Sequence, residues 1–572
     1  MANTKELANF IWAIADLLRG DYKQSDYGKI ILPLTVLRRL DCVLVDTKAD
    51  VLKKFEQVKT MNIQNPDAIL NKVAGYNFHN RSQFDFNKLI ADPNNIAANL
   101  RNYINGYSED AREIIDQFEF DNQIAKLDES NLLFMVLKRF QEVDLHPNQV
   151  SSMEMGYMFE ELIRKFAEIS NETAGEHFTP REVIRLMVNL LFMDDRQTLT
   201  KKGIVKTIYD CCAGTGGMLS VAEEYLHELN PEARLEVFGQ ELNAESYAIC
   251  KSDMLIKGQN PTNIKKGNSI SEDQLPNEKF DYLITNPPFG VKWQKIEKKV
   301  REEHESLGHG GRFGAGLPSV SDGSFLFLMN LMSKMKPEGS RLAIVFNGSP
   351  LFSGSASSTK NESSIRQWII ENDLLEAIIA LPNQLFYNTG IATYIWIISN
   401  HKAKERKGKV QLINAVDFFE NMRKPLGDKR HEISFTQIAE ITKIYGDYNE
   451  SEFCKIFDNK DFGYSKVTVE RPTRDSKDKI IKDKNGKPKA DSSLRDTENI
   501  PLKADIQEYM KREVLPHVPD AWIDESKTNV GYEINFTKYF YQYKPLRSLE
   551  KIKADILAIE QETDGLIKEV IA

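Results

Sequence analysis

The chain has 572 residues, of which 41% are hydrophobic and 28% charged, and this length predicts about three or four domains or subdomains rather than one core. No apolar run approaches the ~20 residues of a membrane span, and the N-terminal helical pattern carries charged residues, so we expect neither a membrane segment nor a signal peptide. The formal net charge of −9 argues against a protein that holds nucleic acid unaided, because such proteins usually carry a basic excess.

The first part of the chain, residues 1–170, is expected to form a helical N-terminal domain. Apolar residues recur there at spacings of three and four, which is typical of amphipathic helices. The examples are Leu7, Ile11, Ile14 and Leu18, then Leu132, Met135, Val136 and Phe140, and the run 155–169. We find no chemical motif in this part of the sequence.

Short β-rich runs alternate with helical ones between residues 171 and 425. The runs are 204–210, 235–242, 280–285, 341–346, 375–382 and 391–399. Such alternation predicts an α/β domain with a largely parallel sheet and helices on both faces. Ligands of such sheets bind beyond the carboxyl ends of the strands, so functional residues are expected there.

A glycine-rich turn, YDCCAGTGGML (209–219), follows the first of these runs. Gly214, Gly216 and Gly217 can adopt conformations closed to other residues and let the backbone approach a ligand. The turn lacks the lysine of a phosphate-binding P-loop and the G-x-G-x-x-G of a dinucleotide fold, which argues against a nicotinamide-dependent dehydrogenase. A purely structural tight turn is the alternative interpretation.

Two polar residues follow in the chain. Glu241 lies at the end of the second run, where a carboxylate can accept hydrogen bonds from two ribose hydroxyls. Asn268 follows a turn and can pair with the edge of a purine. Alone, Glu241 would be interpreted as a surface charge, but its order and spacing relative to the glycine turn favour a binding site.

The run 280–285 ends in a stiff corner, NPPFG (286–290). Pro287 and Pro288 fix their own φ angles and push the preceding residue out of helical space. The corner therefore predicts that Asn286 and Phe289 are held in one orientation at the mouth of the sheet.

A glycine-rich segment, residues 308–325, follows this corner. We interpret it as a mobile loop that orders over a bound substrate, since functional loops are common beside such sites. An inert connector is the alternative.

Beyond residue 425 the sequence is less regular, and residues 426–545 are predicted to form an irregular C-terminal region. Its segment 471–489 carries eight Lys or Arg and three Asp, which favours a solvated basic loop over a nucleic-acid contact. The last stretch, 546–572, has apolar residues at alternating spacings of three and four, which predicts a coiled-coil helix for a partner or for the chain's own body. These residues are Leu549, Ile552, Ile556, Ile559, Thr563, Leu566 and Val570.

The ordered set of glycine turn, ribose acid, polar loop and NPPF corner resembles the amino-methyltransferases that use S-adenosylmethionine, whose fourth motif is (D/N/S)-P-P-(Y/F). The sequence GEHFTPREVIRLMV (175–188) is similar to their F-x-T-P motif, which borders the methionine end of the cofactor. Over nearly the whole chain, the motifs resemble the modification subunit of a type I restriction–modification enzyme. Further matching stretches are MGYMFEELIRKFAE (155–168), KPEGSRLAIVFNGSPLF (336–352) and LPNQLFYNTGIATYIWIISN (381–400).

The resemblance implies a Rossmann-like methyltransferase domain at 171–425 that transfers a methyl group from S-adenosylmethionine to N6 of an adenine flipped out of DNA. It assigns the catalytic corner to Asn286, Pro287, Pro288 and Phe289. It assigns the cofactor site, without a metal, to Glu176, His177, Phe178, Thr179, Pro180, Arg181, Asp210, Ala213, Gly214, Thr215, Gly216, Gly217, Glu241 and Asn268. For His177, packing beside Phe178 is an equally good interpretation, and Cys211 and Cys212 are interpreted as packing residues.

The resemblance also implies partners. A separate specificity subunit would choose the sequence in double-stranded DNA, with two modification subunits around it, and whether a restriction subunit joins stays open. We expect the helix at 546–572 to dock on the specificity subunit. Five cysteines without CxxC pairs or His-rich spacing indicate a reducing compartment and argue against a zinc site, so the predicted location is cytoplasmic.

Three alternatives stay open at this point. An NPPF corner also occurs in methyltransferases that modify glutamine side chains or RNA bases, although those chains are usually shorter. A non-catalytic subunit could bind the cofactor only to gate assembly, but the intact Asn286 and Phe289 argue against it. The third alternative is that the methyl group goes to N4 of cytosine instead of N6 of adenine. This target is disfavoured because family members acting on cytosine N4 usually begin the corner with serine.

Overall fold

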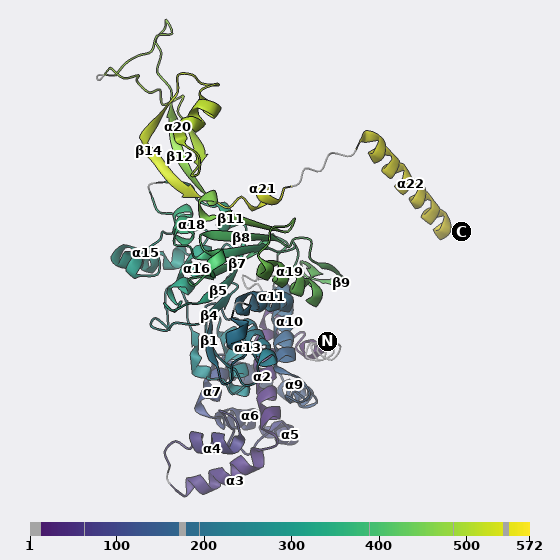
Figure 1. The fold of residues 1–572 in the computed structure, drawn as a ribbon. Helices are drawn as coiled ribbons and strands as arrows, with labels where there is room; N and C mark the ends of the chain where they lie inside the picture. The colour runs from purple at the N-terminus through teal and green to yellow at the C-terminus, as the bar shows by residue number, and fades with distance from the viewer. Residues whose placement is uncertain are drawn as a thin grey trace. The chain divides into compact units, whose positions relative to one another are not determined.

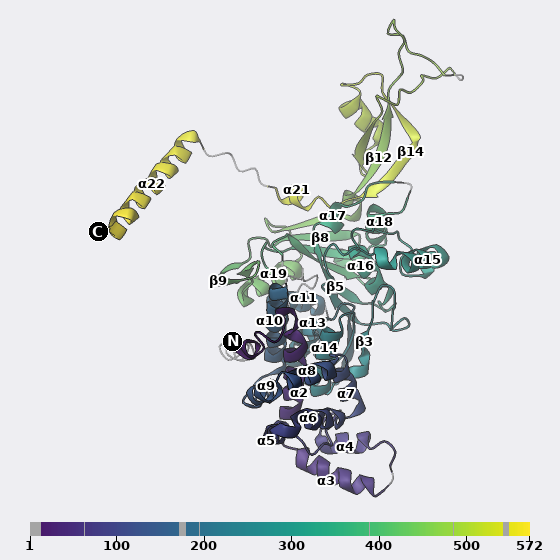
Figure 2. The same cartoon turned by 180° about the vertical axis from the view of Figure 1, so that it is seen from behind.

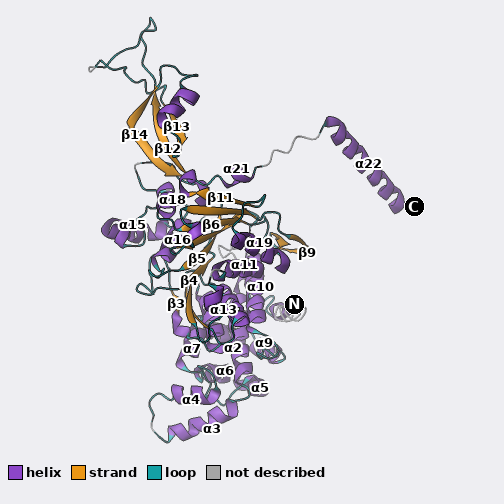
Figure 3. Ribbon diagram, in the orientation of Figure 1, coloured by secondary structure: helices purple, strands orange, loops and turns teal. Residues whose placement is uncertain are grey.

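The computed structural model describes residues 13–61, 63–170, 179–193, 195–357, 359–387, 389–483, 486–541 and 548–571 (Figure 1). The chain divides into two compact units, Met1–Ile534 and Asn535–Ala572. The first unit contains a helical N-terminal part and a mixed sheet flanked by helices (Figure 3). None of the helices in the described ranges combines the length and the apolar character that crossing a membrane requires.

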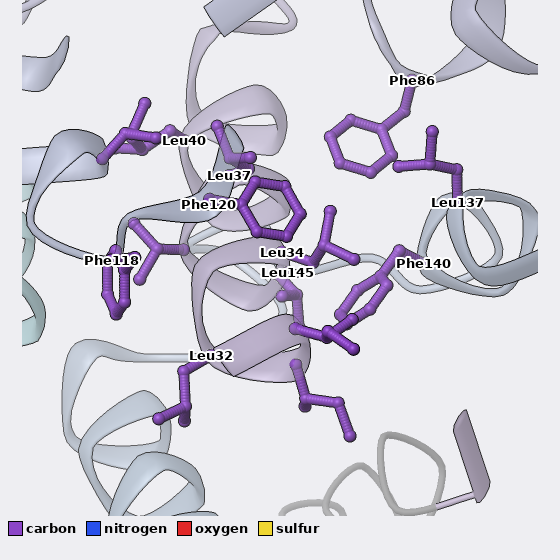
Figure 4. Close-up of a cluster of buried hydrophobic side chains, with 14 of the residues drawn as sticks. Leu32, Leu34, Leu37, Leu40, Phe86, Phe118, Phe120, Leu137, Phe140 and Leu145 are labelled. Carbon is purple, nitrogen blue, oxygen red and sulfur yellow. The ribbon is translucent and has the colours of Figure 1, made fainter. Parts of the chain in front are cut away.

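The N-terminal part is built around α2. Its helices are α2 (Gly28–Leu44), α3 (Lys48–Lys59), α4 (Asp67–Ala74), α5 (Phe86–Ala91), α6 (Ile96–Asn105), α7 (Glu109–Asp116), α8 (Phe120–Glu129), α9 (Leu133–Gln141) and α10 (Ser152–Ser170). α2 is buried along almost its whole length, because most of its residues are apolar. In Figure 4 its leucines lie among Phe86, Phe120 and Phe140 of α5, α8 and α9. Each such side chain contributes about 1.5–3 kcal/mol through burial.

The predicted helical character of this part is confirmed. Ile14, Leu18, Val136 and Phe140 are buried as the periodicity predicts. Met135 is an exception, because it is 44% exposed on the outer side of α9. Leu7 and Ile11 lie outside the described residues.

The main sheet has nine strands in the order β11-β8-β6-β7-β5-β4-β1-β2-β3. They are β1 (Val205–Asp210), β2 (Arg234–Glu241), β3 (Ile264–Lys266), β4 (Tyr282–Thr285), β5 (Arg341–Asn347), β6 (Leu375–Ala380), β7 (Thr393–Ser399), β8 (Lys409–Asn414) and β11 (Cys454–Asp458). Neighbours pair in parallel except for β7, which lies antiparallel between β5 and β6, and β11, which is antiparallel to β8. The predicted, largely parallel sheet is confirmed.

Helices cover both faces of this sheet (Figures 1 and 2). The helices in this part of the chain are α11 (Arg181–Phe192), α12 (Arg196–Leu199), α13 (Gly217–Leu229), α14 (Ala244–Ile256), α15 (Glu297–Leu307), α16 (Ser324–Ser333), α17 (Ser349–Phe352), α18 (Glu362–Glu371) and α19 (Phe435–Asp447). On β5, Ala343 and Val345 join a core formed with α11, α13 and α19, whereas Phe346 contacts Phe325 of α16 edge to face. Because both faces are covered, the central strands are continuously apolar.

The glycine-rich segment 308–325 is packed against the domain rather than open. Arg312 donates hydrogen bonds to the carboxylate of Glu303 and to the carbonyls of Ser269 and Ile270. The neighbouring Phe313 is fully buried. These contacts favour a structural connector over the mobile loop that we interpreted from the sequence.

Regular elements also occur in the segment 426–545, for which irregular structure was predicted. β10 (Lys429–Glu432) forms a hairpin with β9 (Glu420–Leu426), most of which precedes this segment. A separate antiparallel sheet contains β12 (Gly463–Glu470), β13 (Asp496–Pro501) and β14 (Trp522–Tyr532). The short helix α20 (Ile506–Tyr509) lies between β13 and β14 in the sequence. The basic segment 471–489 connects β12 to β13, and most of its described residues are exposed. The domain limits at 170, 425 and 545 stay predictions.

The second unit contains α21 (Phe536–Phe540) and α22 (Leu549–Ile571), so the predicted helical tail is confirmed. In α22, the apolar residues Leu549, Ile556 and Ile559 are 81%, 59% and 63% exposed. An exposed apolar stripe at this spacing is typical of a helix that docks on a partner.

Candidate active site

A cavity of about 350 Å³ lies at the edge of the main sheet, among the segments that follow β1, β2, β3 and β4. Its lining residues are Cys211, Cys212, Gly214, Glu241, Leu242, Asn243, Ser246, Gly267, Asn268, Ser269, Asn286, Pro288 and Phe327. This is the edge at which ligands of parallel sheets bind.

The glycine turn joins β1 to α13. Gly214 and Gly216 have φ angles of 53° and 85°, in the left-handed region that side chains disfavour. Space is also limiting at Gly216, where a Cβ atom would lie 2.8 Å from the Sγ atom of Cys250. The turn therefore keeps its close approach to the cavity only with small residues.

Asp210, the last residue of β1, holds this turn in place. Its Oδ1 atom accepts hydrogen bonds from the backbone N–H of Cys212 at 2.9 Å and from the hydroxyl of Thr285 at 2.7 Å. The side chain is buried, and burial raises the pKa of Asp210 to about 7 although these two hydrogen bonds oppose the change. Asp210 thus ties the ends of β1 and β4 together behind the cavity wall.

Glu241 lies at the end of β2 and lines the cavity. Its two carboxylate oxygens accept hydrogen bonds from the backbone N–H groups of Gly214 and Asn243, each at 2.7 Å. Burial raises the pKa of Glu241, and the backbone hydrogen bonds oppose the rise. The carboxylate is therefore held in a fixed orientation between the glycine turn and the start of α14.

Asn268 lines the same cavity from the loop after β3. Its Oδ1 atom accepts hydrogen bonds from the backbone N–H groups of Ile270 and Ser271, at 3.0 and 3.1 Å. The side chain thus orders its own loop as well as contributing to the lining.

The proline corner closes another side of the cavity through Asn286 and Pro288. Asn286 is 9% exposed, and its Nδ2 atom donates a hydrogen bond to the hydroxyl of Thr179 at 2.9 Å. Thr179 directly precedes Pro180 and α11, so this contact links the F-x-T-P segment to the NPPF corner. The amide of Asn286 is thereby fixed at the cavity wall.

Comparison with known proteins decides the family. The family model described as N-6 DNA Methylase matches residues 151–473, more than half of the chain. The chain belongs to the N-6 DNA methylase family. A second family model, the HsdM N-terminal domain, matches residues 7–140.

Several relatives are similar to this methylase over much of its length. The type I restriction enzyme MjaIX methylase subunit of Methanocaldococcus jannaschii is 24% identical over 466 residues, which cover 78% of each chain. The HindI methylase subunit of Haemophilus influenzae is 29% identical over 265 residues, or 46% of this chain and 54% of that one. The type I methyltransferase subunit of Streptococcus thermophilus, a solved structure, has a TM-score of 0.62 at 22% identity and matches over 80% of this chain and 97% of its own. The predicted methyltransferase fold and the resemblance to type I modification subunits are confirmed.

The structure brings only some of the predicted site residues to the cavity of the methylase. Those that line it are Gly214, Glu241, Asn268, Asn286 and Pro288. Thr179 contacts Asn286, while Pro180, Asp210, Ala213, Thr215, Gly216, Gly217 and Pro287 belong to the neighbouring segments without being part of the lining. Glu176, His177 and Phe178 lie outside the described residues.

Two predicted residues face other contacts. Arg181 binds Glu160 of α10 instead of lining the cavity. Phe289 packs edge to face on Phe386, with ring centroids 6.0 Å apart and planes at 72°.

The lining also contains residues that the sequence did not single out. Asn243 caps α14 by accepting a hydrogen bond from the backbone N–H of Ser246, and this helix-start pattern was visible in the sequence. Phe327 belongs to α16, which is apolar on nearly all sides and offers no periodic signal. Cys211 and Cys212, which we interpreted from the sequence as packing residues, also lie in the lining. The hydrogen bond with Cys211 and burial raise the pKa of Cys212, which disfavours a thiolate nucleophile.

Proposed function

We propose that this methylase transfers a methyl group from S-adenosylmethionine to N6 of adenine in double-stranded DNA, as the modification subunit of a type I restriction–modification complex in the cytoplasm. The observation that carries the proposal is Asn286, whose amide is fixed at the wall of a cavity that also contains Glu241. The family match supports the same reaction.

The described residues of the cavity fit the cofactor in charge and in shape. Among the lining residues that the structure describes, Glu241 is the one charged side chain, and none is Lys, Arg or His. Such a lining suits a cationic or neutral ligand better than a phosphate, which basic side chains or backbone cradles usually bind. Glu241 would hold the ribose hydroxyls, while Leu242 and Phe327 would give apolar contact to the adenine ring. When bound, S-adenosylmethionine supplies a methyl group already activated on a sulfonium.

The NPPF corner would hold the target base. The exocyclic amine of adenine is inaccessible inside a duplex, so the base must leave the stack, at an expense of a few kcal/mol. Stacking of the base on Phe289 can return about 1–3 kcal/mol. The side-chain oxygen of Asn286 and the carbonyl of Pro287 would accept the two N6 protons and orient the nitrogen lone pair. Orientation is expected to provide most of the acceleration, because no strong base is needed before transfer.

We also propose that a separate specificity subunit selects the DNA sequence and is flanked by two copies of this chain. The curated relatives named above are methylase subunits of type I restriction enzymes, which supports this division of labour. The net charge of −9 is consistent with a partner that provides much of the affinity for DNA. A restriction subunit can complete such a complex.

The reaction is tested by producing the chain in cells with and without the proposed specificity subunit, followed by nucleoside analysis of total DNA. We expect N6-methyladenine with the partner present and none without it. N4-methylcytosine in place of N6-methyladenine, or no methylated base with the partner present, would contradict the proposal.

The docking role of α22 is tested by deleting residues 546–572. We expect the shortened chain to lose co-purification with the specificity subunit, since the exposed stripe of Leu549, Ile556 and Ile559 would no longer be available. Binding of S-adenosylmethionine, measured by equilibrium dialysis, should be unchanged. Retained co-purification would refute the docking role.

A further inference from the structure

An arginine joins three segments next to the glycine turn. Arg181, the first residue of α11, donates from Nη2 to the Oε1 atom of Glu160 in α10 at 2.8 Å. It also donates from Nη1 to the carbonyl oxygen of Gly217 at 3.1 Å. Gly217 begins α13 directly after the glycine turn, so one guanidinium connects the helical N-terminal part to the turn.

Two glycines make room for this arginine. A Cβ atom at Gly156, inside α10, would lie 2.5 Å from Nη2 of Arg181. A Cβ atom at Gly217 would lie 3.0 Å from Oε1 of Glu160 and 3.3 Å from Nη1 of Arg181. Neither glycine has a positive φ, so the contact requires the small size of these residues and not their conformational freedom.

The ion pair is buried, since Arg181 is 7% and Glu160 is 8% exposed. The guanidinium also lies over the ring of Tyr157, 4.9 Å from its centroid. Burial raises the pKa of Glu160, and the charge and hydrogen bond of Arg181 oppose that rise. Buried ion pairs add little net stability because desolvation offsets their attraction, whereas their geometry is specific. This pair therefore serves orientation better than stability.

We propose that Glu160 and Arg181 are positioning residues that fix the glycine turn against α10 and thereby set the affinity for S-adenosylmethionine. The inference rests on the proposed function, because it assigns the cofactor to the cavity beside that turn. If these residues act in this way, cofactor binding depends on the position of α10 relative to the glycine turn. A partner that moves α10 would then change cofactor affinity without contacting the cavity.

The test compares two neutralised pairs in the purified full-length chain. Glu160→Gln with Arg181→Gln removes the proposed contact. Glu113→Gln with Lys251→Gln is the control, because that pair, 2.8 Å apart, also joins the N-terminal part to the sheet domain but bonds to Tyr247 of α14 instead of to the glycine turn. Equilibrium dialysis with labelled S-adenosylmethionine is expected to show about tenfold weaker binding for the first double variant and a change within about twofold for the control.

A second variant separates positioning from folding. Gly156→Ala favours the α10 helix, because alanine is the better helix former, but its Cβ atom displaces Arg181. Urea unfolding checks that this variant is folded, and we expect its cofactor binding to weaken several-fold. Wild-type affinity in folded Gly156→Ala, or equal weakening in both double variants, would overturn the inference. A wild-type chain that binds no S-adenosylmethionine would overturn the proposed function and this inference with it.

Discussion

Replacing Asn286 with alanine is expected to lower the single-turnover rate constant for DNA methylation by roughly a thousandfold while leaving the affinity for S-adenosylmethionine within a few-fold of wild type. The substitution removes the proposed acceptor for one N6 proton and the hydrogen bond to Thr179. It leaves Glu241 and its two backbone hydrogen bonds in place. Single-turnover methylation of DNA by the complete complex, together with equilibrium dialysis of the cofactor, measures the two quantities separately.

Asn347→Ala is the matched control for this experiment. Asn347 also ends a strand of the same sheet, β5, and accepts a hydrogen bond from the backbone N–H of Ser349 at 3.1 Å, but it does not line the cavity. We expect nearly wild-type methylation for this variant. Asn286→Asp keeps an acceptor oxygen and should retain far more activity than Asn286→Ala. Full activity of Asn286→Ala would remove the corner from the mechanism.

Asp210→Asn is expected to remove a large part of the pH dependence of stability in the cofactor-free chain. The folded pKa of about 7 lies well above the unfolded value of about 4, so the folded state holds the proton between these values. The stability contribution of Asp210 is therefore complete below about pH 4 and is lost as pH rises toward 7. Between about pH 5 and 8 the free energy of unfolding therefore falls by roughly 3 kcal/mol. Asparagine does not ionise, so the variant avoids this loss, and its side-chain oxygen can still accept the hydrogen bonds from Thr285 and Cys212. Urea unfolding at several pH values measures the difference.

Asp281→Asn provides a control of opposite sign. Burial would raise the pKa of Asp281, but hydrogen bonds from Lys336 and Lys206 overcome it and lower the pKa. Its stabilisation is therefore present above about pH 4 and is lost only at lower pH, so Asp281→Asn should destabilise by a constant amount between about pH 5 and 8. A parallel pH dependence for wild type and Asp210→Asn would show that Asp210 ionises normally.

Much of the sheet could be predicted from the sequence, because its central strands are long, apolar and bounded by polar turns. β1, β5 and β7 coincide closely with predicted runs. β3 could not be predicted, since it has three residues, two of them lysines, and is defined by pairing with β2. β12 alternates polar and apolar residues within a segment of charged composition, and its pairing with β13 and β14 is a tertiary property.

The candidate site shows the same division. Glu241 and Asn286 could be predicted because each directly follows, or ends, an apolar strand, and parallel strands bring their carboxyl ends to one edge. The direction of Arg181 could not be predicted, since it depends on how α10 packs beside the glycine turn. The same holds for Phe289, whose contact with Phe386 joins segments about a hundred residues apart.

The position of β7 has a consequence for synthesis on the ribosome. β7 follows β6 in the chain but lies between β6 and β5, so neither of those strands acquires its final neighbour until Thr393–Ser399 has emerged. Until then both offer unpaired backbone edges with apolar side chains, and such edges invite aggregation. Nascent chains and fragments ending before Thr393 should accordingly bind chaperones and be insoluble when released, however well the earlier cavity residues are ordered.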